Sequence, residues 1–183
     1  GTGGLGLLFG CWLVQSGVER LALLSRKGTV AQGGHQHYKQ LQGSATEHSV
    51  GVELSNMAAE AQASHAVERD MAGVVHSAGV LADALLRNQT QAGLQKVWEP
   101  KATAAWTIHT SLCRVLKEVE AFVLFSSVAA LLGNAGQANY SAANACLDAL
   151  SHERQKSGLA ASSTQWSAWA GVGMAATSGV VEQ

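Results

Sequence analysis

The sequence predicts an α/β fold, a doubly wound parallel sheet with helices on both faces. Short apolar runs alternate with helical patterns along the 183 residues, which is the order of repeated strand–helix–strand units. Hydrophobic residues make up 47% of the chain and charged residues only 14%, a balance typical of a sheet buried between helices. A glycine-rich run stands directly before the first helical pattern, with no strand ahead of it. We therefore expect residues 1–183 to form one subdomain that lacks its first strand and is incomplete at both ends.

The first half of the chain alternates apolar strand patterns with helical ones. The run RLALLS over 20–25 is apolar on both faces, as in a strand that is covered from both sides. Gly17 is the stop expected just past the end of a helix. The elements predicted here are a helix over 5–16, a strand over 20–25, a polar helical stretch through Leu41, a short strand over 50–54, a weakly amphipathic helix over 56–69 and a strand over 73–76.

The second half has the same alternation, with the chain's only proline inside a helical pattern. Pro100 has no N–H to donate, so it is expected to interrupt the helix around it. Gly158 is again placed as a helix stop. The elements predicted here are a long interrupted helix over 91–117, a strand over 122–126, a helix over 136–156 and a last strand over 162–166.

Composition and spacing argue against several classes of protein. The formal net charge is −1, so no basic surface for nucleic acid or an acidic membrane is expected. Cys11, Cys113 and Cys146 are odd in number and widely spaced, which predicts buried thiols in a reducing compartment. His35 and His37 have no third ligand beside them, so no metal site is predicted. No apolar run reaches the ~18 residues of a membrane span. We expect a cytoplasmic location, or a plastid one if the source is an alga.

The glycine-rich run at the start suits the phosphates of a dinucleotide. Without side chains the backbone can approach a pyrophosphate, and the following helix offers free N–H groups and the positive end of its dipole. The alternative is a flexible chain tip, which the helix after the run and the strand ending at Ser25 disfavour. The phosphate-binding residues predicted here are Gly1, Thr2, Gly3, Gly4, Leu5 and Gly6.

The end of the strand over 20–25 predicts which dinucleotide binds. An acidic residue here would bind the ribose 2′-hydroxyl of NAD, whereas Arg26, directly after Ser25, suits the 2′-phosphate of NADP. A planar guanidinium can bind a phosphate through two hydrogen bonds and stack on adenine. The alternative is a solvated basic turn. The predicted cofactor is NADPH.

Ser127, Tyr140, Asn144 and Lys101 form the most informative group in the chain. Ser127 precedes Tyr140 by thirteen residues and Tyr140 begins a helix, which is the arrangement of short-chain dehydrogenases/reductases. An ordinary member has Lys four residues after the Tyr, where this chain has Asn144, and here the Lys lies upstream in E-P-K101. This exchange resembles the ketoreductase domains of polyketide synthases and animal-type fatty acid synthases. The resemblance extends over nearly the whole chain and implies a Rossmann-like fold.

The resemblance implies a catalytic role for each of the four residues. Hydride transfer to a ketone leaves an alkoxide, and Tyr140 is the expected proton donor. A free phenol has a pKa of about 10, which the ammonium of Lys101 is expected to lower. Lys101 is also expected to bind the nicotinamide ribose, and Ser127 to donate to the substrate carbonyl. Asn144 lies one turn after Tyr140 and would hold Lys101 or a relay water. The alternative for Tyr140 alone is an aromatic residue at a helix edge.

The resemblance also implies further cofactor contacts. The family usually has an Asp after its third strand for the adenine amine, and this chain has Glu53 there, followed by Leu54. Glu53 can accept the same hydrogen bond; the alternative is a surface charge. The run H-S-A-G after the strand over 73–76 resembles the family's H-A-A-G, which passes beneath the adenosine ribose. The expected additional contacts are Ser25, Arg26, Glu53, Leu54, His76, Ser77, Ala78, Gly79, Lys101 and Tyr140.

Two further motifs concern the substrate. Domains that give a D-configured 3-hydroxyl carry an L-D-D-like motif after H-x-A-G, and this chain has Leu81, then Ala, then Asp83. Domains that give the L product carry a Trp eight residues before the Tyr, and this chain has Leu132 there. The expected product is therefore D-configured. Gln137, and Trp166 in a W-x-x-W stretch, complete the expected substrate contacts.

The resemblance predicts the NADPH-dependent reduction of a 3-ketoacyl thioester during polyketide synthesis. The expected partners are an acyl carrier protein with its phosphopantetheine-linked chain and the neighbouring domains of a multidomain synthase. The alternatives are the same step in a type I fatty acid synthase, a stand-alone bacterial-type reductase, and an inactive scaffold that binds NADPH. A scaffold would be expected to have lost Tyr140, Ser127 or Lys101, and all three are present.

Overall fold

The structure is a computed structural model that describes residues 2–25, 28–30, 33–48, 51–56, 71–114 and 118–169. For 51–56 it describes the backbone. The chain divides into two compact units, one of Gly1–Ala66 with Trp169–Gln183 and one of Val67–Ala168. Each unit has its own sheet and its own apolar core, and each is described by itself.

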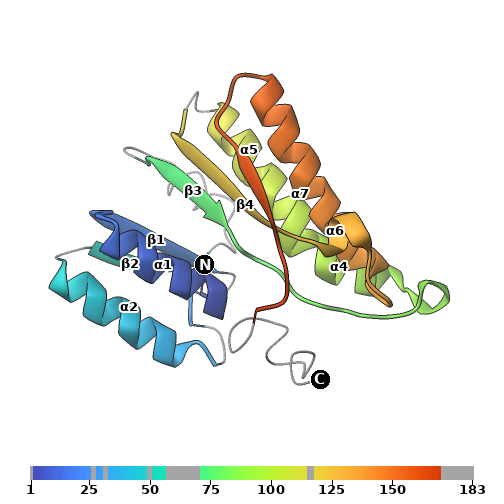
Figure 1. Cartoon of the computed structure of the whole chain (residues 1–183), viewed down its shortest axis with the longest axis horizontal. Coiled ribbons are helices and arrows are strands. Elements are labelled where there is room, and N and C mark those ends of the chain that lie inside the picture. Colours follow the sequence, from blue (N-terminus) through green and yellow to red (C-terminus); the bar gives the residue numbers. More distant parts are fainter. Residues whose placement is uncertain are drawn as a thin grey trace. The chain divides into compact units, whose positions relative to one another are not determined.

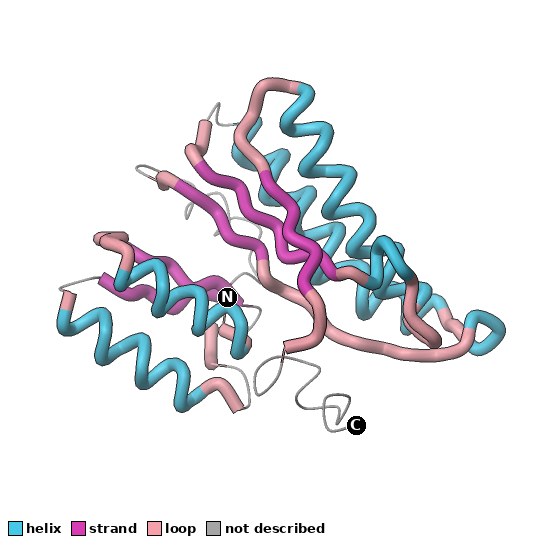
Figure 2. Tube along the Cα trace, viewed as in Figure 1, coloured by secondary structure: helices cyan, strands magenta, loops and turns pink. Residues whose placement is uncertain are grey.

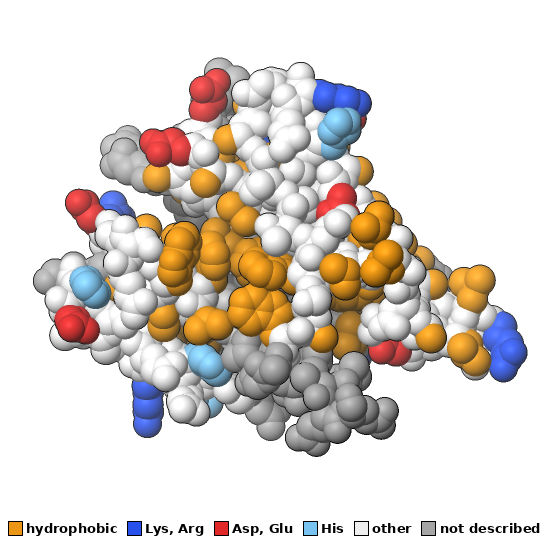
Figure 3. All heavy atoms as spheres, in the orientation of Figure 1, with side chains coloured by type: hydrophobic (Ala, Val, Ile, Leu, Met, Phe, Trp, Pro, Cys, Tyr) orange, Lys and Arg blue, Asp and Glu red, His pale blue; other side chains and the backbone are white. Residues whose placement is uncertain are grey.

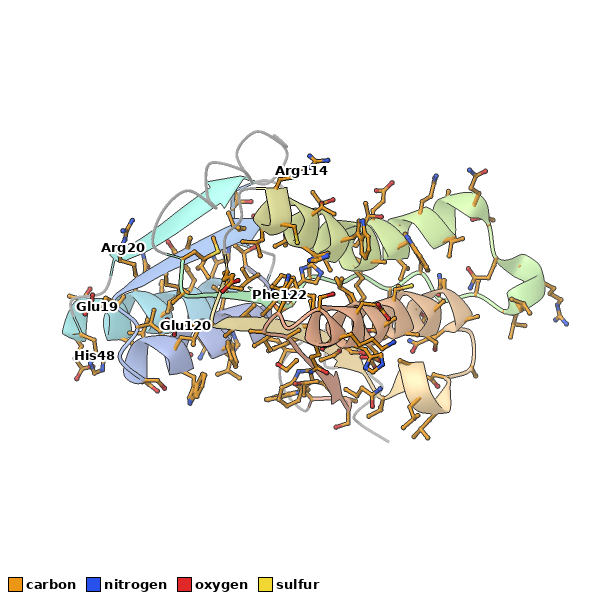
Figure 4. All side chains as sticks on the ribbon, turned by 90° about the horizontal axis from the view of Figure 1, so that it is seen from above. Glu19, Arg20, His48, Arg114, Glu120 and Phe122 are labelled. Atoms are coloured by element: carbon orange, nitrogen blue, oxygen red, sulfur yellow. The ribbon has the colours of Figure 1, made fainter. Side chains whose placement is uncertain are left out.

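The first unit pairs two parallel strands with two helices. Its elements in chain order are α1 (Gly4–Gln15), β1 (Arg20–Ser25), α2 (His35–Glu47) and β2 (Gly51–Asn56). Strands β1 and β2 are parallel, in a register that runs from Arg20 opposite Gly51 to Ser25 opposite Asn56. Helices α1 and α2 lie side by side on one face of the strand pair (Figures 1 and 4). Their common core consists of Leu7, Cys11, Val14, Leu23 and Leu41.

The second unit contains a three-stranded parallel sheet in the order β3-β4-β5. The strands are β3 (Gly73–His76), β4 (Ala121–Ser127) and β5 (Ser162–Trp166), shown in magenta in Figure 2. Helices α5 and α7 share one core with β4, because their apolar faces meet the apolar side chains of that strand. The helical segments are η1 (Leu86–Asn88), α4 (Gln91–Trp98), η2 (Glu99–Thr103), α5 (Ala104–Arg114), α6 (Ala129–Leu132) and α7 (Ala138–Lys156). The buried core residues are Ala105, Leu112, Val119, Phe122, Leu124, Leu147 and Leu150.

Most of the predicted elements are confirmed to within a few residues. The strands over 20–25, 73–76 and 162–166 have the predicted bounds, and all strand pairs are parallel. The interruption expected near Pro100 is confirmed, because α4 ends at Trp98, the chain passes through the π-helical turn η2, and α5 begins at Ala104. The short helices η1 and α6 were not predicted. The helix expected over 56–69 lies almost entirely outside the described residues.

The cysteine prediction is only partly confirmed. Cys11 is buried, Cys146 is half-buried and Cys113 is exposed on α5. The prediction fails at Cys113 because successive residues of a helix point about 100° apart, so with Leu112 in the core the next residue faces outward. None of the helices in the described part of the chain is both long and apolar enough to span a membrane.

Candidate active site

The second unit brings all four predicted catalytic residues together around the start of α7. Ser127 ends β4, Lys101 lies in η2, and Tyr140 and Asn144 lie in the first two turns of α7. The carboxyl ends of parallel strands lie at one edge of a sheet, where helices that begin beside them place their first residues. The side chains of Ser127 and Asn144 both lie close enough to the Tyr140 phenol to lower its pKa by hydrogen bonding.

Ser127 is held in place by the chain that follows it. Its Oγ accepts a hydrogen bond from the backbone N–H of Ala129, with a distance of 3.2 Å. That bond uses a lone pair of the hydroxyl, so the single hydroxyl proton is directed to the Tyr140 phenol and can pass to the carbonyl oxygen of a bound substrate. Ser127 is half-buried, so a substrate can reach it. The predicted role as a carbonyl donor is compatible with this geometry.

The pKa of Tyr140 is shifted in the direction opposite to the one that we expected. Burial raises the pKa of its phenol, and the hydrogen bonds from Asn144 and Ser127 oppose that rise without cancelling it. We expected Lys101 to lower this pKa. The net direction is upward because Tyr140 is only 9% exposed, and burial outweighs the hydrogen bonds; the Lys101 ammonium lies 5.2 Å from the centre of the ring. That distance is in the range of a cation–π contact.

Lys101 is a buried cation with a defined partner. It is 3% exposed, and its Nζ donates to the backbone oxygen of Phe125 at 3.0 Å. Burial lowers the pKa of Lys101 to about 8, and the negative charge of Asp148 opposes this shift. The ammonium is therefore mostly charged at neutral pH and loses its proton as the pH rises through about 8.

Asn144 does not hold Lys101, which corrects one of its two expected roles. Its Nδ2 donates to the backbone oxygen of Tyr140, one turn earlier in α7, at 2.8 Å. Lys101 uses Phe125 as its acceptor. Asn144 is fully buried, and its Oδ1 has no hydrogen-bond partner among the residues that the structure describes. A buried acceptor of this kind calls for a donor such as water.

The loop after β3, which contains the predicted substrate residues, is tied to the start of α7. Gln137 donates from Nε2 to Oδ2 of Asp83 at 2.9 Å, so these two predicted contacts meet. Asn139, which the sequence analysis missed, donates to the backbone oxygen of Ala82 at 2.8 Å and accepts the N–H of Tyr140 at 2.7 Å. Its position directly before Tyr140 was the one available signal. Leu81 is half-buried in the same loop.

Apolar side chains are exposed beside these two segments. Figure 3 shows hydrophobic side chains gathered over α6 and over the loop around η1. They include Leu85, Leu86, Leu131 and Leu132, the last of them 79% exposed. Trp166 ends β5, half-buried, with its ring centre 5.4 Å from that of Phe125. Trp166 therefore packs in the sheet and also stands at the edge where the catalytic residues lie.

The first unit contains the predicted phosphate-binding loop. Gly3 is the N-cap of α1 and has an extended backbone, no side chain caps the helix, and its first turn contains no acidic residue. A Cβ built at Gly3 would meet nothing within 4 Å. Thr2 is buried, and Gly4, Leu5 and Gly6 form the first turn of α1. This helix end has the free donors and the open space that a pyrophosphate requires.

The structure describes only some of the predicted cofactor residues. Gly1 and Arg26 lie outside the described residues, as do the side chains of Glu53 and Leu54. Ser25 ends β1, and its hydroxyl donates to the backbone oxygen of Thr29 at 3.3 Å. His76 ends β3 in the second unit, and the residues that follow it are half-buried: Ser77, Ala78 and Gly79.

Comparison with known proteins identifies the family. A model of the KR domain matches residues 1–171. The chain belongs to the KR domain family. The spectinabilin polyketide synthase protein NorB of Streptomyces orinoci is 44% identical over 178 residues, covering 94% of this chain and 8% of NorB. The pikromycin polyketide synthase component PikAII of Streptomyces venezuelae is 39% identical over 180 residues, covering 93% of this chain and 5% of PikAII.

Solved ketoreductases share the fold. A structure of A-type ketoreductases from a modular polyketide synthase has a TM-score of 0.84 and 36% identity, over 96% of this chain and 37% of that one. The first ketoreductase of the tylosin polyketide synthase has a TM-score of 0.82 and 37% identity, over 95% of this chain and 38% of that one. The predicted short-chain dehydrogenase/reductase fold and the resemblance to polyketide synthase ketoreductases are thus confirmed. Ketoreductases reduce a ketone to a hydroxyl with a nicotinamide cofactor.

Proposed function

We propose that this KR domain uses NADPH to reduce a carrier-bound 3-ketoacyl thioester to the 3-hydroxyacyl thioester during polyketide synthesis. The observation that supports this most is the meeting of Lys101, Ser127 and Asn144 at the phenol of Tyr140. The proposal includes one catalytic subdomain over residues 1–183 and the cytoplasmic setting expected from the cysteines.

The residues divide the chemistry of ketone reduction between them. The bound cofactor supplies the hydride. Ser127 donates its hydroxyl proton to the ketone oxygen of the bound substrate and stabilises the charge that develops there. Tyr140 keeps its proton near neutral pH because its pKa is raised, and it can therefore give that proton to the alkoxide. Lys101 supplies a buried positive charge over the ring, which stabilises the phenolate that remains.

Asn144 completes the proposed route by which Tyr140 regains its proton. Its Oδ1 is buried and unpaired among the described residues, and a water that donates to it would stand close to the Tyr140 phenol, beside which the Asn144 side chain lies. Water is both donor and acceptor, so it can pass a proton toward the phenolate. We propose this relay role for Asn144 in place of a direct bond to Lys101.

Each unit, taken by itself, contains residues that would hold one part of NADPH. The uncapped N-terminus of α1 at Gly3 offers donors to the pyrophosphate, and Arg26 follows β1 where a 2′-phosphate would be bound. Glu53 and Leu54 follow in β2 for the adenine, and the run from His76 to Gly79 for the adenosine ribose. Lys101 would also contact the nicotinamide ribose.

The proposed partners follow from the family. The two relatives described above are polyketide synthase proteins, and this chain matches 8% or less of the length of each. We propose that an acyl carrier protein presents the 3-ketoacyl chain on its phosphopantetheine arm. Leu81, Asp83, Gln137 and Trp166 would contact it, since Asp83 is bonded to Gln137 three residues before Tyr140 and Trp166 pairs with Ser127 in the sheet.

Turnover of a short 3-ketoacyl thioester by the intact protein tests this function. Loss of NADPH with formation of the 3-hydroxyacyl thioester is expected. Binding of NADPH with no turnover would favour the inactive scaffold instead.

Arg26 is expected to set the coenzyme preference. Charge-assisted hydrogen bonds to a phosphate make Arg26→Ala weaken NADPH by roughly 10–150-fold while NADH is unchanged. Dissociation constants for both coenzymes measure this, with Arg20→Ala, at the other end of β1, as the matched control. Equal weakening of both coenzymes would make Arg26 a structural residue.

The product is expected to be D-configured at the new hydroxyl. Asp83 is present and bonded to Gln137, and Leu132 stands where the L-producing domains have Trp. Chiral chromatography of the product measures the configuration. A predominantly L product would show that the Leu81–Asp83 motif does not steer the substrate in this chain.

A further inference from the structure

Lys101 lies in a widened helical turn whose backbone is fixed from outside the helix. The segment η2 is π-helical, and π-turns are rare and concentrate at functional sites. Pro100, at the second position of this turn, has no N–H and so cannot donate within the helix. The turn therefore has fewer internal backbone hydrogen bonds than an α-helical turn of the same length. Its position depends more on hydrogen bonds from residues outside the helix.

His76 makes the bond that fixes this turn to the sheet. Its Nε2 lies 3.1 Å from the backbone oxygen of Lys101, and the two residues are 5% and 3% exposed. A carbonyl oxygen has two lone pairs, so it can accept this bond beside one from the helix. Because a carbonyl only accepts, the neutral ring must carry its hydrogen on Nε2.

The imidazole ring of His76 is uncharged at neutral pH. Burial, and then the nearby charge of Lys101, lower the pKa of His76 to about 4. The bond to the Lys101 carbonyl is therefore present at neutral pH and does not depend on titration of His76 there.

Lys101 is thus anchored at both ends from two adjacent strands. His76 at the end of β3 holds its backbone oxygen, and Phe125 in β4 accepts from its Nζ at 3.0 Å. The two strands pair in parallel with His76 opposite Leu124, directly before Phe125. The side chain of Lys101 joins these two bonded atoms, so the position of its backbone limits where the ammonium can reach.

We propose that His76 is a positioning residue for catalysis: its Nε2–H fixes the backbone of Lys101 and thereby places the ammonium over Tyr140. The inference rests on the role proposed above for Lys101. This role belongs to the side chain of His76. The expected role beneath the adenosine ribose belongs to the backbone of the H-S-A-G run. A displacement of about 1 Å in a catalytic group can lower a rate on the order of 10²-fold.

Two substitutions separate the hydrogen bond from simple packing. His76→Leu fills much of the space and removes the donor, whereas in His76→Gln the side-chain amide can place an N–H near the position of Nε2. In the intact protein, kcat should fall on the order of 10–10²-fold in the Leu variant and be largely restored in the Gln variant. The pH at which activity falls on the basic side should rise in the Leu variant, because a displaced Lys101 regains water and its pKa moves up from about 8.

His109→Leu is the matched control for lost stability. Its ring lies on α5 in the same unit and accepts from the buried Arg154 at 2.8 Å, so its removal also breaks one buried contact. We expect a lower Tm with kcat and pH profile unchanged. A wild-type kcat in His76→Leu, or a Gln variant as slow as the Leu variant, would overturn the proposal. If Lys101→Met itself keeps wild-type activity, the failure lies with the proposed catalytic role of Lys101 and not with His76.

Discussion

Tyr140→Phe is expected to lower kcat for ketone reduction by on the order of 10²–10⁴-fold, because it removes the positioned proton donor. The ring, its burial and the cation–π contact with Lys101 remain, so the fold and the binding of NADPH should persist. Steady-state kinetics on a 3-ketoacyl thioester, together with a coenzyme titration, measure both quantities.

The chain contains a natural control for this substitution. It has two tyrosines, and the other, Tyr38, packs at the edge of the apolar core of the first unit. Tyr38→Phe should leave kcat unchanged. Equal effects of the two substitutions, or wild-type turnover by Tyr140→Phe, would contradict the assignment of the donor.

Lys101→Met is expected to reduce kcat by on the order of 10²-fold or more, because the buried charge over Tyr140 is lost. In the unsubstituted protein the rate should fall as the pH rises through about 8, where Lys101 gives up its proton. The Lys101→Met variant should not show this fall in rate. Rates measured across that pH range test the prediction.

As the pH rises and Lys101 loses its proton, the stability of the folded protein should rise while its activity falls. Its pKa is lower in the folded protein than the ordinary 10.5, so between pH 8 and 10.5 the unfolded chain binds more protons and stability rises with pH. Below pH 8 the folded protein bears the full cost of burying the charge. Methionine removes that cost, so Lys101→Met should be at least as stable at pH 7. Lys156→Met, which removes an exposed lysine paired with Glu153, is the control and should change neither property. A clearly unstable Lys101→Met would mean that its loss of activity reports unfolding.

The sequence predicts those features that depend on neighbours along the chain. Alternating apolar runs locate the strands, and the spacing from Ser127 to Tyr140 places one residue at a strand end and the other in the first turn of a helix. The exchange of Lys101 and Asn144 identifies the family, which the comparisons confirm.

The features that sequence alone did not predict arise from contacts between distant segments. The interruption predicted near Pro100 takes the form of a π-turn at Lys101, and the bond from this turn to His76 joins residues 25 positions apart. Asn139 reaches the loop that contains Ala82, 57 positions away. The direction of the Tyr140 pKa depends on how deeply α7 is buried, which no local pattern reports.

Transfer of deuterium is the most direct test of the central claim, that this domain delivers a hydride from NADPH to the ketone carbon of a 3-ketoacyl thioester. The intact protein is supplied with NADPH deuterated at the transferable position of nicotinamide C4 and with a 3-ketoacyl thioester in ordinary water. We expect a 3-hydroxyacyl thioester with one deuterium on the carbon that bears the hydroxyl. We expect no labelled product from the Tyr140→Phe variant. Bound coenzyme with no labelled product from the unsubstituted protein would contradict it.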